Sequence, residues 1–126
     1  MDKDTILDLV KEEFHFVDGK MGIFDFSSIE EAKKKIDKLL LRPGVYIFYN
    51  GETAIKVGKH RIDPRGRAVI GWREAWSAGS NELDASLMII TLGENCTHWV
   101  CAIEEFLENS FRAMNFEKFI RSRRRC

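Results

Sequence analysis

The chain has 126 residues, of which 44% are hydrophobic and 32% charged, a composition typical of one globular domain with a buried core. Its 20 basic and 20 acidic residues cancel, so the net charge gives no argument for a nucleic-acid partner. Apolar runs such as residues 87–90 are far too short to cross a bilayer, and no signal peptide or lipidation motif is visible. We therefore expect a protein without a membrane partner.

The charges are distributed unevenly along the chain. Residues 1–41 hold ten acidic residues and seven lysines, whereas residues 42–126 hold ten acidic and thirteen basic residues, including every arginine. Because the rigid fork of arginine suits phosphate oxygens, this asymmetry favours a phosphate-bearing partner for the second part. Ordinary solvated surface charge is the alternative.

The chain has three cysteines, Cys96, Cys101 and Cys126. An odd number of cysteines, with only two of them near each other in the sequence, suits a reducing compartment better than a disulfide framework. We therefore interpret all three as free thiols and expect a cytoplasmic protein.

Residues 1–42 predict helices and carry no residue that we expect to be catalytic. A first helix begins near Asp4, with apolar residues at helical spacing: Ile6, Leu7, Val10 and Phe14. A turn with a short strand is expected over residues 15–26. Ser27 and Ser28, followed by Glu30 and Glu31, form a capping-box pattern that starts a second helix. We interpret this part as an N-terminal helical extension that covers a sheet or mediates dimerisation.

Residues 43–60, PGVYIFYNGETAIKVGKH, predict a β-hairpin. Two β-rich runs, residues 44–49 and 53–57, flank an Asn-Gly turn signal. A two-residue loop would mix apolar and polar side chains on each face of the hairpin. A three-residue loop that takes in Glu52 gathers most apolar side chains on one face, so we predict the odd loop, with a bulge.

The predicted register has two consequences for the faces of the hairpin. One face becomes a core layer, with Val45, Ile47, Tyr49, Thr53, Ile55 and Val57. The other face carries Tyr46 directly opposite Lys56, together with Gly44, Phe48, Ala54 and Gly58. A phenol beside an ammonium is an unusual pair for a hairpin to present, and it marks this face as a candidate site.

A further helix is predicted after the hairpin, with Asp63 as its cap and Pro64 as its first residue. Its buried stripe is expected at Val69, Trp72 and Trp76. On a helical wheel Arg67 lies opposite that stripe, whereas Arg65 falls within it. Arg67 is therefore the arginine expected to face a groove, and two surface arginines without a function are the alternative.

The last part of the chain predicts a strand and a long helix. Residues 86–92, SLMIITL, are apolar almost throughout, as expected for a central strand buried on both faces. The helix is expected over residues 97–114, and Glu104 lies at the border of its apolar arc. A carboxylate at the rim of a core can be a metal ligand or an acid with a perturbed pKa, and a glutamate that merely extends to solvent is the alternative.

Two motifs of the hairpin resemble the GIY-YIG nuclease superfamily. Residues 44–46, Gly-Val-Tyr, are similar to the family's Gly-Ile/Val-Tyr strand. Residues 56–58, Lys-Val-Gly, are similar to its Tyr-Ile/Val-Gly strand, with lysine in place of the second tyrosine, as in a subgroup that includes some restriction enzymes.

Two helical motifs add to the resemblance. The family places an arginine in the helix after the hairpin, which Arg67 or Arg65 matches. It places a metal-binding glutamate in the context apolar-Glu-x-x-Leu, which residues 103–107 match with Glu104. An asparagine often follows, where this chain has Asn115.

The resemblance implies a mixed α/β fold with a small three-stranded antiparallel sheet flanked by helices, and a nuclease-like domain over residues 43–126. It implies metal-dependent hydrolysis of DNA phosphodiester bonds, with Mg²⁺ or Mn²⁺ as cofactor. The side chains expected to act in catalysis are Tyr46, Lys56, His60, Arg67 and Glu104. Those expected to contact nucleic acid are Lys59, Arg61, Arg65 and Asn115.

The chemistry of these residue types fits such a reaction. Glu104 would hold the metal ion, and Arg67 would stabilise charge on the scissile phosphate. Tyr46 would position or deprotonate the water, because a neighbouring Lys56 favours the phenolate over the phenol. His60 is a candidate second proton carrier.

Three functions remain open from the sequence. The first is a DNA endonuclease, which would need a homodimer or repeated encounters to cut both strands. The second is a nucleic-acid-binding module of the same fold without catalysis, which would bind DNA in a salt-sensitive way without turnover. The third is an interaction domain in which Tyr46 and Lys56 are ordinary surface residues.

Overall fold

The computed structural model describes residues 3–15, 21–35, 37–50, 53–69 and 85–114. These residues form a mixed α/β fold around one antiparallel sheet with the strand order β1-β4-β2-β3. The strands are β1 (Gly22–Phe26), β2 (Gly44–Asn50), β3 (Thr53–His60) and β4 (Ala85–Thr91). The helices are α1 (Lys3–Glu13), α2 (Ile29–Lys34), the short 3₁₀ helices η2 (Lys38–Leu40) and η3 (Glu94–Trp99), and α4 (Val100–Met114).

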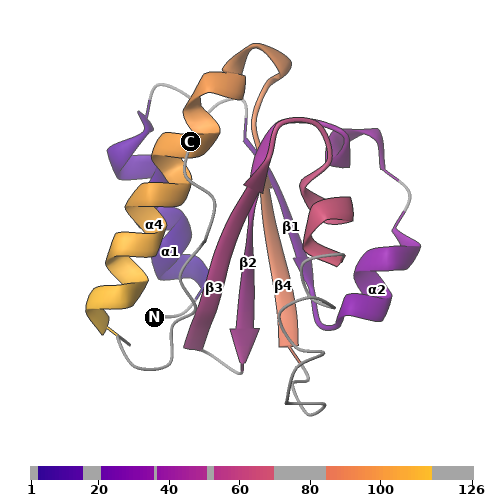
Figure 1. Ribbon diagram of the computed structural model, residues 1–126, viewed down its shortest axis with the longest axis horizontal. Helices are drawn as coiled ribbons and strands as arrows, with labels where there is room; N and C mark the ends of the chain where they lie inside the picture. The colour runs from indigo at the N-terminus through magenta and orange to yellow at the C-terminus, as the bar shows by residue number, and fades with distance from the viewer. Residues whose placement is uncertain (1–2, 16–20, 36, 51–52, 70–84, 115–126) are drawn as a thin grey trace.

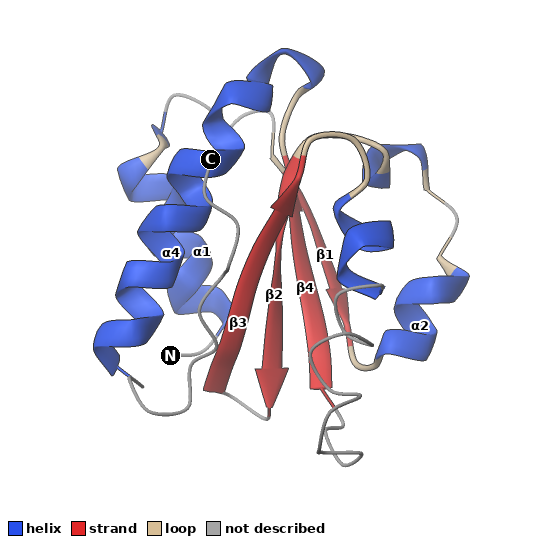
Figure 2. Cartoon of the chain, in the orientation of Figure 1, coloured by secondary structure: helices blue, strands red, loops and turns tan. Residues whose placement is uncertain are grey.

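A further helix starts at Pro64 and is described over residues 64–69. Figure 1 shows α1 and α4 on one side of the sheet, and α2 with the helix that follows β3 on the other side. Figure 2 shows the same three layers by element type, with the strands between two helical layers. The sheet is therefore covered on both faces.

The predicted α/β class is confirmed, but the described part of the sheet has four strands where three were expected. The additional strand, β1, pairs with β4 along its whole length, from Gly22 opposite Thr91 to Phe26 opposite Leu87. Residues 1–42 therefore contribute a strand to the same sheet. They also contribute α1, whose Ile6 is fully buried in the core that α4 shares.

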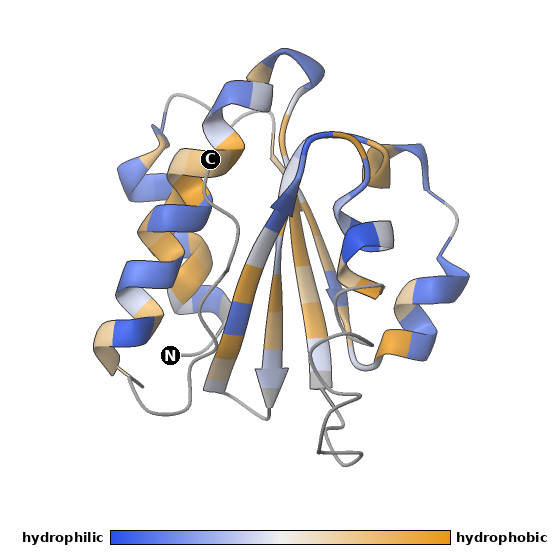
Figure 3. Ribbon diagram, in the orientation of Figure 1, coloured by the Kyte–Doolittle hydropathy of each residue, from blue (hydrophilic) through white to orange (hydrophobic). Residues whose placement is uncertain are grey.

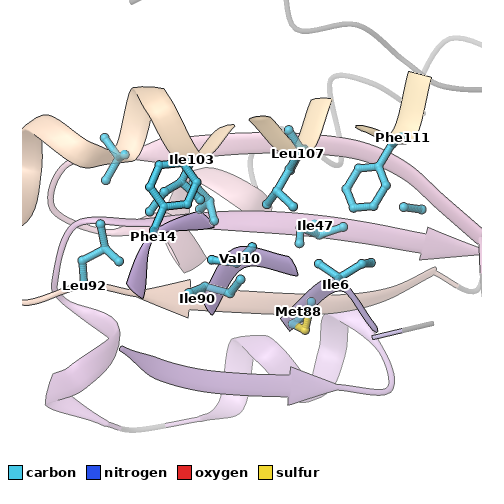
Figure 4. Close-up of a cluster of buried hydrophobic side chains, with 14 of the residues drawn as sticks. Ile6, Val10, Phe14, Ile47, Met88, Ile90, Leu92, Ile103, Leu107 and Phe111 are labelled. Carbon is cyan, nitrogen blue, oxygen red and sulfur yellow. The ribbon is translucent and has the colours of Figure 1, made fainter. Parts of the chain in front are cut away.

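Two hydrophobic cores lie on the two faces of the sheet. The first, shown in part in Figure 4, packs α1 and α4 on the sheet through Val10, Ile47, Ile90, Ile103 and Leu107 among others. The second core lies under α2 and the helix that starts at residue 64. Its buried members are Phe26, Ile29, Ala32, Leu40, Tyr46, Phe48, Ile55, Ala68, Leu87 and Ile89. As predicted, β4 contributes to both cores because it is buried on both faces.

The hairpin register differs from the predicted one. Asn50 pairs with Thr53, and the shift that keeps the apolar face together is a bulge inside the strands, between Phe48 and Tyr49. As a result Tyr46 lies opposite Gly58, not opposite Lys56, which instead faces Phe48. The extra residue lies on β3 and reverses the alternation there, so Ala54 and Ile55 lie on the faces opposite to those predicted, whereas Tyr49 lies on the predicted core face.

The start of α2 confirms the capping-box pattern. The backbone N–H of Glu31 donates to the Ser28 hydroxyl at 3.1 Å, and the Glu31 carboxylate accepts from the backbone N–H of Ser27 at 2.9 Å. The helix is short, because its regular turns end at Lys34 and the 3₁₀ helix η2 follows.

Candidate active site

Glu104 and Lys59 form a buried ion pair between α4 and β3. The Glu104 side chain is 7% exposed and the Lys59 side chain 17%, and Lys59 Nζ lies 3.3 Å from Glu104 Oε1. Lys59 pairs with Val45 on β2, whose side chain is in the core under α4, so the lysine points to that face. Burial raises the pKa of the Glu104 carboxyl, and the Lys59 ammonium offsets this only in part.

Glu104 is the carboxylate that the sequence resemblance assigns to a Mg²⁺ or Mn²⁺ ion. In the described part of the chain no three His, Cys, Asp or Glu side chains converge on one point. Mg²⁺ does not need such a cage, because it keeps several waters and binds through one or two carboxylates plus substrate phosphates. The Lys59 ammonium already lies against Glu104 Oε1. A metal ion would therefore compete with this lysine for the carboxylate.

Tyr46 lies on the opposite face of the sheet from Glu104. It is 4% exposed and belongs to the core that contains Ala68, and its ring packs edge-on against Phe48 with 5.5 Å between centroids. The interpretation of Tyr46 as a surface phenol beside an ammonium is therefore wrong. The alternation of β2 explains this, because Val45 and Ile47 point to the face that α4 covers.

The glycine of the second hairpin motif makes room for this phenol. A Cβ atom on Gly58 would collide with the Tyr46 ring and its hydroxyl, and Gly58 is the residue directly opposite. Because β3 has no strand neighbour on its outer side among the described residues, the Tyr46 hydroxyl lies over an outer strand. The Tyr46 phenol therefore lies against Gly58 on one face of β3, and the next residue, Lys59, pairs with Glu104 on the other face.

We expect Gly58→Val to destabilise the fold by about 1–3 kcal/mol, because the added side chain must displace a packed ring. Chemical denaturation measures this loss. In a Tyr46→Ala background the same Gly58→Val change should cost much less, since the ring is gone. An equal cost in both backgrounds would mean that Gly58 does not accommodate Tyr46.

The two candidate arginines have different surroundings. The Arg65 guanidinium donates to the backbone carbonyl of Lys35, which fastens the start of its helix to the end of α2. Arg67 is half-buried, and its backbone N–H donates to the Asp63 carbonyl at 3.1 Å. Arg65 therefore has a structural contact, and Arg67 is the arginine that the helical wheel of the sequence favours for catalysis.

His60 and Asp63 together build the turn that follows β3. His60 Nδ1 accepts from the backbone N–H groups of Ile62 at 3.1 Å and Asp63 at 2.8 Å. The Asp63 carboxylate accepts from the N–H of Gly66 at 3.0 Å, which confirms the predicted helix cap. Nδ1 of His60 is thus engaged in the turn, and only Nε2 is left for the proton transfer expected of this residue.

The structure brings together some of the expected residues and separates others. Lys59 and Glu104 contact each other, and Lys56 lies close enough to Glu104 for its charge to lower the carboxyl pKa. Tyr46 and the helix that carries Arg67 lie on the other face. Arg61 is exposed in the loop after β3. Asn115, Trp72 and Trp76 lie outside the described residues.

The partnership of Lys59 with Glu104 was missed by sequence reasoning, which gave Lys59 only a nucleic-acid contact. The signal lay in the strand alternation, because Val57 and Lys59 share a face and α4 covers that face.

The interpretation of all three cysteines as free thiols also changes. Cys96 is a free, buried thiol, whereas Cys101 is disulfide-bonded.

Comparison of this chain with family models, with curated proteins and with solved structures finds no match. The resemblance to the GIY-YIG superfamily therefore rests on the motifs of the sequence, and what it implies about function is a proposal. Among the described residues no helix is long and apolar enough to span a bilayer.

Proposed function

We propose that this chain is a metal-dependent endonuclease that hydrolyses DNA phosphodiester bonds at β3. The observation that carries the proposal is the buried Glu104 carboxylate, which contacts the lysine directly after the second hairpin motif. Most carboxylates are exposed, and one held in a core beside an ammonium is arranged for charge chemistry or for a cation. The order hairpin, helix, strand, helix over residues 44–114 also agrees with the resemblance.

Each residue has a role in this proposal. Glu104 holds Mg²⁺ or Mn²⁺, which when bound lowers the pKa of a water molecule and neutralises charge on the phosphate. Lys59, released from Glu104, pairs with a phosphate oxygen. Arg67 stabilises the developing negative charge. Tyr46, buried in the opposite core, packs against Gly58 from the other face and supports β3.

A second candidate function is a DNA-binding module without catalysis. Two observations favour it: the sheet stands between Tyr46 and Glu104, and Lys59 already neutralises the carboxylate. In this case the ion pair is a structural element of the core. Lys59 and Glu104 would then fasten β3 to α4, and the basic residues around the hairpin would still bind phosphates.

Plasmid cleavage separates these functions. We expect wild-type protein to nick supercoiled plasmid with Mg²⁺ or Mn²⁺ and to leave it intact with EDTA. DNA binding without nicking under all these conditions would favour the binding module. Absence of both binding and nicking at low salt would contradict both and leave an interaction domain.

The oligomeric state and the cellular compartment are also proposals. One Glu104 site cuts one strand per encounter, so double-strand cleavage would use a homodimer or two visits. Cytoplasmic localisation is proposed on the same footing, because a DNA substrate lies inside the cell.

A further inference from the structure

Two segments far apart in the sequence run side by side at one end of the sheet: residues 35–44, which lead into β2, and residues 60–65, which follow β3. Gly44 pairs with His60 at one end of these segments. At the other end the Arg65 guanidinium donates to the Lys35 carbonyl. Figure 1 shows α2 and the helix after β3 on the same side of the sheet, in agreement with these contacts. These two contacts join the segments near their ends.

Basic residues are concentrated on these segments and beside them. Residues 33–44 and 59–65 contain only two acidic residues, Asp37 and Asp63. Each accepts a backbone N–H, from Leu39 at 2.9 Å and from Gly66 at 3.0 Å respectively. The same ranges contain eight basic residues: Lys33, Lys34, Lys35, Lys38, Arg42, Lys59, Arg61 and Arg65. In a chain whose net charge is zero, this is a local excess of positive charge.

Exposed apolar side chains lie on the same segments. Leu41 is 56% exposed and Ile62 is 66% exposed, and Leu39 adds a third at 40%. Figure 3 shows α2 and the loop after β3 as largely hydrophilic ribbon. Leu41 precedes Arg42 and Ile62 follows Arg61, so each of these two apolar side chains adjoins an arginine.

We infer that this basic end of the molecule, made of Lys34, Lys35, Lys38, Arg42 and Arg61 with Leu41 and Ile62, is a docking surface for duplex DNA. The cations would contact phosphates, while Leu41 and Ile62 would contact sugars or base edges in the minor groove. The inference rests on the proposed function, since it gives the path of the DNA that reaches Glu104. Lys59 lies two residues before Arg61, so the basic end adjoins the end of β3 that carries Lys59, although α2 and Glu104 lie on opposite faces of the sheet.

This assignment gives the lysines around α2 a function that the sequence did not indicate. An anionic membrane is the other surface that attracts cations mixed with apolar groups. Membrane-surface binding usually relies on a helix with one continuous apolar face. Here Leu41 and Ile62 come from loops, and the lysines come from the end of a six-residue helix and from η2. Duplex DNA is therefore the better fit.

The first test measures the salt dependence of binding to a labelled duplex in EDTA, between about 50 and 200 mM salt. Lys34→Gln/Lys35→Gln/Lys38→Gln should weaken binding and reduce the slope of log K against log salt by roughly 3, about 0.9 for each lost phosphate contact. Lys38→Gln alone should reduce the slope by roughly 1. Lys11→Gln, an exposed lysine of α1 on the other side of the sheet, is the matched control and should leave the slope unchanged.

The second variant, Leu41→Ser/Ile62→Ser, tests the apolar contacts. It should weaken binding several-fold at one salt concentration without changing the slope, because apolar contacts release no counterions. Ile23→Ser, an exposed apolar residue of β1, is the matched control and should bind as wild type does.

Three outcomes would overturn the inference. If wild type binds the duplex but the triple lysine variant keeps its affinity and slope, the basic end is not the docking surface, and the proposed function is untouched. Wild type that binds no DNA contradicts both. Tighter binding to phosphatidylserine vesicles than to the duplex, lost in the same variants, would assign this surface to a membrane.

Discussion

Glu104→Gln is expected to lower metal-dependent cleavage of plasmid by roughly 100-fold or more while leaving DNA binding intact. Glutamine has nearly the shape of glutamate, and its amide oxygen can still accept from Lys59 at the position of Oε1. It lacks the negative charge that a divalent cation needs from its one protein carboxylate. The rate is measured as nicking at several Mn²⁺ concentrations, with thermal unfolding to confirm that the variant folds.

Glu105→Gln is the matched control for this experiment. Glu105 follows Glu104 on α4 but is exposed to solvent, so its change should leave cleavage within about 2-fold of wild type. Equal activity of wild type and Glu104→Gln would contradict the metal role of Glu104. Lost DNA binding by Glu104→Gln would point instead to a structural role.

Lys59→Met should destabilise the protein by on the order of 3 kcal/mol at neutral pH, because it leaves a buried carboxylate without its cation. Both side chains of the pair are largely buried, so solvent cannot take the place of the ammonium. The Glu104 carboxyl, whose pKa burial already raises, then loses the nearest charge that lowers it. Urea denaturation at several pH values measures the effect.

The loss should depend on pH in a definite direction. The folded-state pKa of Glu104 is raised above the ordinary value of 4.5, and more so without Lys59. Between 4.5 and the folded-state pKa the folded protein binds more protons than the unfolded chain, so stability falls as pH rises through that window. Below it, Glu104 is protonated in both states. Lys59→Met should therefore cost least in acid and most at neutral pH.

Two variants control this prediction. Lys56→Met removes a cation with a smaller effect on the same carboxyl and should cost clearly less. Glu104→Gln should rescue Lys59→Met, because a neutral amide needs no cation. A Lys59→Met loss that is independent of pH, or that persists in the double variant, would mean that the ion pair is not its cause.

Elements with strong local signals could be predicted from the sequence. The start of the helix at residue 64 follows from Asp63 and Pro64, and its cap is made by the Asp63 carboxylate and carbonyl. The helix α4 and the strand β4 follow from their apolar patterns. These signals need only a few neighbouring residues, so tertiary structure does not override them.

Pairings between distant segments could not be predicted. β1 is only five residues long and its partner β4 lies more than sixty positions away, so its place in the sheet depends on contacts that the sequence does not mark. The position of the bulge could not be predicted for a related reason. Ala54 and Ile55 are both apolar, so the pattern of hydrophobic residues is the same wherever the alternation reverses.

The candidate site shows the same limit. The helical wheel placed Glu104 at the rim of the core, and the structure buries it. The wheel does not tell which face of the sheet α4 covers. Since α4 packs on the face of Val45, Glu104 meets Lys59 and is separated from Tyr46 by the sheet. The composition of a site built from several elements depends on which face of the sheet each helix covers.

Paramagnetic relaxation by Mn²⁺ tests most directly whether the Glu104 carboxylate holds a divalent cation. In ¹⁵N-labelled protein, low Mn²⁺ should broaden the backbone amide signals of Lys59 and Glu104 first, and Glu104→Gln should abolish this while Glu105→Gln does not. The amide of Phe26, in the opposite core, should stay sharp. Signals of Lys59 and Glu104 that stay sharp at Mn²⁺ concentrations that support nicking would show that the metal binds elsewhere.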